Sequence, residues 1–251
     1  MNKRTKLFMI SVLAVASLLT ITSCNKTNAS ATIKVGYTPL KTAASTRNVV
    51  ATGKYALYTK PGTVKGAKRV ASKSQMKKFA SYTRADTDYY ELIGRNHAYK
   101  GSTYYFRAYG YKVTYTGSVY YRVVTMNGKY RGYVYGGKKV GSFAGGVKKA
   151  TTTQAAAIPA NFKDYVGVII PGSVWNYPPY TQYKTKRLGK VNWTIPSLAK
   201  FKVTKAVKRT REQDTYYYLK SQKSSVPSGW VSSRYVISYS EVESNEGITH
   251  N

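Results

Sequence analysis

The amino-acid sequence predicts an all-β protein made of two tandem small barrels that follow an N-terminal signal peptide. Three observations carry this prediction: strand-like alternation after residue 48, turn-forming Gly, Pro and Asn between the alternating segments, and a unit that recurs at an offset of 96 to 97 residues. Helical periodicity is scarce. Only residues 73–82, where Met76 and Phe79 recur at helical spacing, predict a helix, and it would be short.

The signal peptide is expected to occupy residues 1–31. A basic start precedes an apolar run over residues 7–22, which is shorter than the roughly twenty residues that a membrane-spanning helix needs. This pattern is typical of an export signal. No later apolar run is long enough to cross a membrane, so we expect no transmembrane segment in the mature chain.

Two cleavage sites compete at the end of this signal. The small-residue tripeptide Ala-Ser-Ala at 29–31 would release Thr32 as the new N-terminus, whereas the lipobox-like Ile-Thr-Ser-Cys at 21–24 would leave Cys24 as a lipid anchor. Cys24 is the one cysteine of the chain. We therefore expect no intrachain disulfide, and stability must come from packed cores.

Strands are expected where β-branched and aromatic residues gather between turn residues. The clearest such segments are residues 54–59, 104–109, 118–124 and 130–134. Asn127-Gly128 separates the last two and predicts a hairpin with a type I′ turn.

The second half of the chain repeats the first. The matched positions are Leu57 with Val174, Phe106 with Phe201, Tyr121 with Tyr217, and Gly132 with Gly229. The predicted organisation is a linker at 32–47, a first repeat at 48–147 with an insertion near 84–103, a second linker at 148–160, a second repeat at 161–240, and an acidic disordered tail at 241–251.

Each repeat ends in a hairpin of similar sequence, Tyr-Tyr-Arg-Val-x5-Lys-x-Arg-Gly-Tyr-Val in the first and a Gly-Trp-Val ending in the second. These hairpins resemble those of bacterial SH3-like domains. Residues 58–68, 106–110 and 117–137 further resemble the N-terminal wall-binding region of lactobacillary S-layer proteins of the brevis/buchneri type. The resemblance covers residues 48–240 and implies SH3-like barrels that bind cell-wall polymer by charge and shape. We expect no lattice-forming region after the second repeat.

The charge of the chain is strongly unbalanced. It has 41 Lys and Arg against 9 Asp and Glu, a formal net charge of +32, and residues 32–240 hold 37 of the basic residues and only six of the acids. Such an excess predicts binding to a polyanion. The basic residues expected to contact it are Lys65, Lys68, Arg69, Lys77, Lys78, Arg107, Arg122, Arg131, Lys184, Lys186, Arg187, Lys202, Lys205, Lys208 and Arg209.

The 26 tyrosines add flat, hydrogen-bonding surface beside the charge. Those expected to stack on sugar rings of the polymer are Tyr105, Tyr121, Tyr133 and Tyr217. Trp230, in the Gly-Trp-Val ending, is instead expected to close the core of the second barrel.

Catalytic chemistry is not indicated by any motif. The chain lacks a Gly-x-Ser-x-Gly elbow, a phosphate-binding loop and a dinucleotide-binding fingerprint. Asp86, Asp88, Glu91 and His97 cluster in the insertion, and we interpret them as a solvated loop rather than a cation or acid–base site. We therefore expect no enzymatic activity, no metal and no cofactor.

Together these observations predict an exported, non-catalytic protein that binds anionic or neutral cell-wall polysaccharide, teichoic acid included. Its expected place is the wall or cell surface of a Gram-positive bacterium, where other surface proteins are further candidate partners. Two alternatives stay open. The chain could be a targeting module or small accessory of a wall-active enzyme, or an extracellular nucleic-acid binder, which the charge alone permits.

Overall fold

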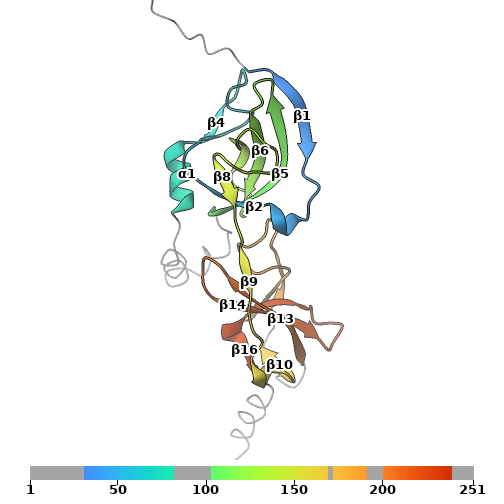
Figure 1. Ribbon diagram of the computed structural model, residues 1–251. Coiled ribbons are helices and arrows are strands. Elements are labelled where there is room, and N and C mark those ends of the chain that lie inside the picture. Colours follow the sequence, from blue (N-terminus) through green and yellow to red (C-terminus); the bar gives the residue numbers. More distant parts are fainter. Residues whose placement is uncertain (1–30, 82–102, 169–171, 191–199, 239–251) are drawn as a thin grey trace, which may run out of the picture.

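The computed structural model describes residues 31–81, 103–168, 172–190 and 200–238, which form two antiparallel sheets lying end to end along one long axis (Figure 1). The first domain comprises β1 (Ile33–Pro39), β2 (Asn48–Ala51), β3 (Leu57–Tyr58), β4 (Arg69–Ala71), β5 (Tyr105–Thr114), β6 (Val119–Thr125), β7 (Arg131–Tyr135) and β8 (Val147–Lys149), with the 3-10 turn η1 (Ala44–Arg47) and helix α1 (Lys73–Ala80). The all-β, two-domain prediction is confirmed.

The second domain is built in the same way. It comprises β9 (Thr153–Ala155), β10 (Tyr165–Val168), β11 (Ser173–Trp175), β12 (Arg187–Lys190), β13 (Phe201–Arg209), β14 (Thr215–Ser221), β15 (Gly229–Ser232) and β16 (Val236–Ser238), with the 3-10 turns η2 (Ala160–Phe162) and η4 (Ser233–Tyr235).

The strand order of the two sheets is the same. It runs β4-β3-β7-β6-β5-β2-β8 in the first domain and β12-β11-β15-β14-β13-β10-β16 in the second, with β1 added to β5 and β9 added to β13. The register also matches: Tyr121 lies opposite Val134, and Tyr217 lies opposite Val231. The repeat alignment made from the sequence is therefore confirmed strand by strand.

Both segments expected to be linkers carry strands instead. Residues 32–47 contain β1, and residues 148–160 contain the end of β8 and all of β9. Only three residues, 150–152, join the two sheets, and their backbone is held on both sides. The Ala150 amide donates to the Asn48 carbonyl oxygen at 3.0 Å, and the Thr210 amide donates to that of Thr152 at 3.1 Å. Small polar residues here make a tightly bonded crossing point, not a loose connector.

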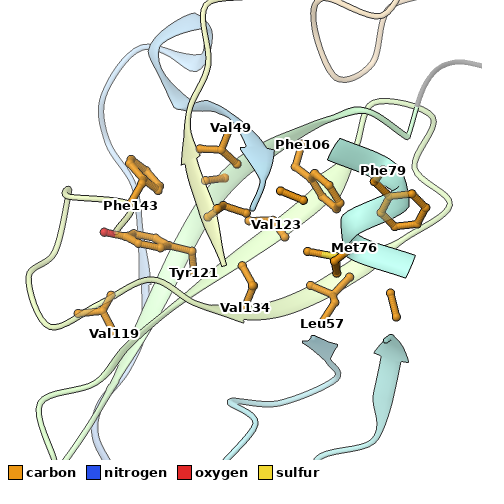
Figure 2. Packing of buried hydrophobic residues seen from close by; sticks show 14 residues of the cluster. Val49, Leu57, Met76, Phe79, Phe106, Val119, Tyr121, Val123, Val134 and Phe143 are labelled. Atoms are coloured by element: carbon orange, nitrogen blue, oxygen red, sulfur yellow. The ribbon is translucent and has the colours of Figure 1, made fainter. Parts of the chain in front are cut away.

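The core of the first domain lies between the curled sheet and α1, as Figure 2 shows. Ser72 caps the helix by accepting the Gln75 amide at 3.1 Å, and the helix buries Met76 and Phe79 against Phe106 of β5. Residues at alternate positions of β6, Tyr121 and Val123, fill the centre of the sheet (Figure 2). The expected helix is thus confirmed, two residues shorter than predicted.

The hairpin between β6 and β7 uses a different turn from the one predicted. A type I′ turn needs positive φ at both central residues, but here Gly128 alone of the pair has it, at 75°. The Gly128 amide donates to the Thr125 carbonyl oxygen at 2.8 Å, and the Asn127 side chain accepts from the Thr125 hydroxyl and the Lys129 amide. Asn127 stabilises the turn through its side chain rather than through its backbone conformation.

One glycine in each domain lets two strands approach closely. A Cβ atom at Gly132 in β7 would collide with the Tyr58 carbonyl oxygen, and one at Gly229 in β15 would come within 2.6 Å of the Trp175 carbonyl oxygen. These are matched positions of the repeat, so the same close packing of neighbouring strands recurs in both domains.

We predict that Gly132→Ala lowers the free energy of unfolding by about 1–3 kcal/mol, the usual effect of an overpacked site. Gly36→Ala is the matched control, because a Cβ at Gly36 meets nothing within 4 Å. Thermal or urea unfolding of the two variants measures the difference. Equal stability of both variants would show that the strands can move apart at no cost.

The buried tyrosines predict alkaline unfolding. Burial raises the pKa of Tyr105, Tyr120, Tyr121, Tyr133 and Tyr217. The folded protein therefore keeps these protons where the unfolded chain loses them, and stability should fall as pH rises above about 10. We expect part of the tyrosinate absorbance to appear only together with loss of the circular dichroism signal. Complete tyrosine ionisation before any unfolding would contradict this.

Candidate functional site

A lateral row of side chains crosses the outer face of the first sheet. Tyr58 of β3 pairs with Tyr133 of β7, which pairs with Arg122 of β6. Their sequence neighbours Tyr121 and Val134 point into the core, so strand alternation turns Tyr133 and Arg122 to the opposite face.

Arg122 is the centre of this row. Its guanidinium carbon lies 5.7, 5.4 and 5.8 Å from the ring centres of Tyr37, Tyr109 and Tyr133. Tyr37 comes from β1, and its ring occupies the space above Gly110 that a side chain there would fill. Within the described residues Arg122 donates to no protein acceptor, and its N–H groups are held beside the rings by cation–π attraction only.

Two further cations extend the row. Lys112 lies 5.6 Å from the Tyr133 ring centre. Arg131 donates to the Tyr109 hydroxyl at 3.1 Å and to the Tyr183 hydroxyl, from the second domain, at 2.7 Å. We call this surface the cation–tyrosine ladder; its members are Lys112, Arg122 and Arg131 with Tyr37, Tyr109, Tyr133 and Tyr183.

The electrostatics of the ladder follow from its composition. Burial raises the pKa of Tyr133, and the positive charge of Arg122 opposes that effect. For Arg131, burial lowers the pKa, but the hydroxyls of Tyr109 and Tyr183 more than offset it, so the pKa is raised overall. Arg131 therefore stays cationic and Tyr133 stays neutral at physiological pH.

No carboxylate balances this charge within the described first domain. Residues 31–81 and 103–149 contain 20 Lys and Arg and no Asp or Glu. Among the described residues, tyrosine rings and hydroxyls are therefore the groups that face these cations; Asp86, Asp88 and Glu91 lie outside the described residues. That is the condition under which Lys and Arg bind phosphates.

The matched row of the second domain is aromatic. Trp175 of β11 pairs with Trp230 of β15, which pairs with Tyr218 of β14, and Tyr218 pairs with Lys205 of β13. Tyr218 and Trp230 meet edge to face, with ring centres 5.5 Å apart. A ring therefore stands where the first domain has Arg122. Such flat aromatic surfaces suit the apolar faces of sugars.

Trp230 does not have the core position predicted for it. It lies half-buried on the outer face, whereas its neighbour Val231 is in the core. Strand pairing explains the difference: Val231 shares the inward face with Tyr217, and Trp230 faces outward with Tyr218.

The four tyrosines predicted to stack on sugar are all buried. Tyr105, Tyr121, Tyr133 and Tyr217 are 0–6% exposed. Tyr121 stacks on Phe143 with ring centres 4.2 Å apart, and its hydroxyl accepts the Gly141 amide at 2.6 Å. The prediction that Tyr105, Tyr121 and Tyr217 contact a polymer is corrected, because these three rings belong to core clusters. Tyr133 lies instead on the ladder side of the sheet, beside Arg122 and Lys112.

Two of the predicted basic contacts are buried as well. Arg209 is 1% exposed and pairs with Asp214 at 2.6 Å and Glu212 at 3.6 Å, so its charge is neutralised inside the second domain. Arg107 is 8% exposed and lies at the junction of the domains. These two residues are not part of an open polymer-binding face.

The other predicted basic residues lie at the surface. Arg122 and Lys208 are half-buried, and Lys65, Lys68, Arg69, Lys77, Lys78, Arg131, Lys184, Lys186, Arg187, Lys202 and Lys205 are exposed. They are spread over the β3–β4 connection, α1 and β12–β13 of two domains. The structure brings Arg122 and Arg131 together and leaves the rest as general positive surface.

Sequence reasoning missed four members of the ladder: Tyr37, Tyr109, Lys112 and Tyr183. Tyr37 was missed because residues 32–47 read as a linker, and Tyr183 because it comes from the other domain. Strand alternation alone would separate Tyr109 from Lys112, because the register shift between Ala108 and Gly110 is not visible in the sequence.

Several predictions fall outside the described residues. These are Cys24 and the cleavage sites, most of the insertion with Asp86, Asp88, Glu91 and His97, and the tail at 241–251. Within the residues that are described, no group of His, Cys, Asp and Glu could hold a metal ion. In the same part of the chain no helix is long and apolar enough to cross a membrane.

Comparison with known proteins identifies no family. No family model and no curated protein matches the chain. A solved structure from Listeria monocytogenes, which carries the provisional name autolysin, aligns at 13% identity over 82% of this chain and 66% of that chain, with a TM-score of 0.27. At that TM-score the likeness supports no statement about function.

We predict that Trp230→Ala destabilises the second domain less than Leu219→Ala, although tryptophan is the larger side chain. Leu219 is fully buried, and its loss should cost about 2–5 kcal/mol. Trp230 is half-buried outside the core cluster, so its removal should leave a cooperative melt. Denaturant unfolding of both variants decides, and the reverse order would return Trp230 to the core.

Proposed function

We propose that this protein binds an anionic cell-wall polymer, of the teichoic acid class, at the outer surface of a Gram-positive cell, without catalysis. The observation that carries the proposal is the cation–tyrosine ladder in a domain whose described residues contain no acid. The N-terminal signal and the resemblance to S-layer wall-binding regions support the location, and they make the wall the first polyanion to test.

The ladder fits a chain of phosphates. Arg122 presents guanidinium N–H groups that no described protein atom accepts, and Arg131 and Lys112 flank it. Tyrosine rings hold the long side chains in place, which lowers the entropy lost when a phosphate binds. Charge-assisted hydrogen bonds to phosphate then supply affinity.

The aromatic row of the second domain fits the sugars that separate or decorate such phosphates. Trp175, Tyr218 and Trp230 offer ring surface next to Lys205. A polymer that alternates charge and sugar would find both chemistries on one chain, at matched positions of the repeat.

The proposal is tested by Arg122→Gln in a pull-down with purified cell-wall sacculi. A charge-assisted hydrogen bond contributes about 1.5–3 kcal/mol, so the variant should bind roughly ten- to a hundredfold more weakly. Lys78→Gln is the matched control: it removes one positive charge from an exposed site on α1, an element that contributes no member of the ladder. Its binding should fall by less than about threefold, as for a single screened surface charge.

Equal losses in the two variants would mean that charge acts without a site, and unchanged binding of Arg122→Gln would reject the ladder. Competition separates the nucleic-acid alternative. Duplex DNA that displaces the protein from sacculi as well as soluble teichoic acid does would favour a general polyanion binder over a wall protein.

A further inference from the structure

The junction between the two domains contains a pair of arginines that pair with no carboxylate among the residues that the structure describes. Arg107 of β5 donates through Nε to the Asn48 Oδ1 atom at 3.0 Å, and through Nη2 to the Gln182 Oε1 atom of the second domain. Both acceptors are neutral amides, although Arg107 is only 8% exposed to solvent. A buried cation with neutral partners only is costly unless an anion is near.

Arg47 brings a second positive charge to the same place. It ends η1, drawn as the short blue coil beside the junction in Figure 1. Its Nη1 donates to the Leu40 carbonyl oxygen at 2.7 Å, and its buried Nε has no hydrogen-bond partner within the described residues. Arg47 directly precedes Asn48, the residue of β2 that pairs with Arg107 of β5. The charge of Arg47 lowers the pKa of Arg107, after the larger effect of burial.

The surroundings hold this geometry in place from both domains. The Asn48 amide nitrogen donates to the Thr181 carbonyl oxygen at 3.1 Å and to the Thr152 hydroxyl at 3.3 Å, which turns Asn48 Oδ1 toward Arg107. Tyr177, from the second domain, also interacts electrostatically with Arg107. The pair therefore lies in a frame made of both domains, and none of the described residues that form this frame is an acid.

We propose that a phosphate group binds between Arg47 and Arg107 and fixes the two domains relative to each other. A phosphate oxygen would accept the unpartnered Arg47 Nε, and further oxygens would accept the free N–H groups of Arg107, whose fork geometry matches phosphate. Neutralising two like charges at a junction that both domains build favours the bonded arrangement over a separated one. The site is distinct from the outer ladder, so free phosphate should bind whether or not the ladder holds polymer.

Thermal unfolding of the full chain, at constant ionic strength, tests the site with inorganic phosphate against chloride. Ligand binding to the folded state alone should raise the melting temperature by about 5–10 °C at a hundredfold excess of phosphate over its dissociation constant. Equilibrium dialysis should find one such phosphate per chain. A glycerophosphodiester forms the second arm: stabilisation by it as well would identify polymer phosphate as the source, and stabilisation by inorganic phosphate alone would identify the free ion.

Arg47→Gln is the informative variant, because the one side-chain hydrogen bond of Arg47 among the described residues, to the Leu40 carbonyl oxygen, stays within the first domain. It should lose the phosphate-dependent rise and, without phosphate, be at least as stable as the wild type, since a like-charge repulsion is removed. Arg107→Gln should lose the rise too. Arg69→Gln and Arg122→Gln should keep it, which separates this site from general charge and from the ladder. No rise beyond chloride in the wild type, or the same rise in Arg47→Gln, would overturn the proposal.

Discussion

The shortage of carboxylates is the constraint on which the rest of the structure depends. With 20 cations and no acid, the described part of the first domain cannot hold its arginines by salt bridges of its own. Tyrosine side chains position these arginines instead: Arg122 lies among three rings, and Arg131 donates to two hydroxyls. Rings and hydroxyls position a cation without neutralising it, so the charge stays available to an external polyanion.

The two repeats share one strand order but present different side chains on the outer face of the sheet. The sheets share strand order, register and the close-packing glycines Gly132 and Gly229, while the outer row changes from Tyr58, Tyr133 and Arg122 to Trp175, Trp230 and Tyr218. Because these side chains face away from the core, they could diverge without disturbing packing. The short crossing at 150–152, with Tyr183 reaching back to Arg131, keeps the two surfaces on one body.

Local patterns predicted the strands, the helix and the repeat because each depends on periodicity within a few residues, as in α1 and the β6–β7 hairpin. They failed where partners are remote. A tyrosine on an alternating strand reads the same whether it faces the core, as Tyr121 does, or the outside, as Tyr109 does. The strand β1 was missed because residues 32–47 have weak β patterning and pair with β5, about seventy residues away. The sequence likewise showed an excess of charge but not which arginine lacks a partner.

The most direct test of the central claim is a salt series of sacculus binding, before and after anionic polymer is stripped from the wall. If several phosphates are neutralised, affinity for intact sacculi should fall steeply as salt rises, by roughly 10³–10⁵ between 50 and 200 mM for six to ten contacts. Stripped sacculi should bind weakly at every salt concentration. Equal binding to stripped and intact walls, with no dependence on salt, would contradict recognition of an anionic polymer by charge.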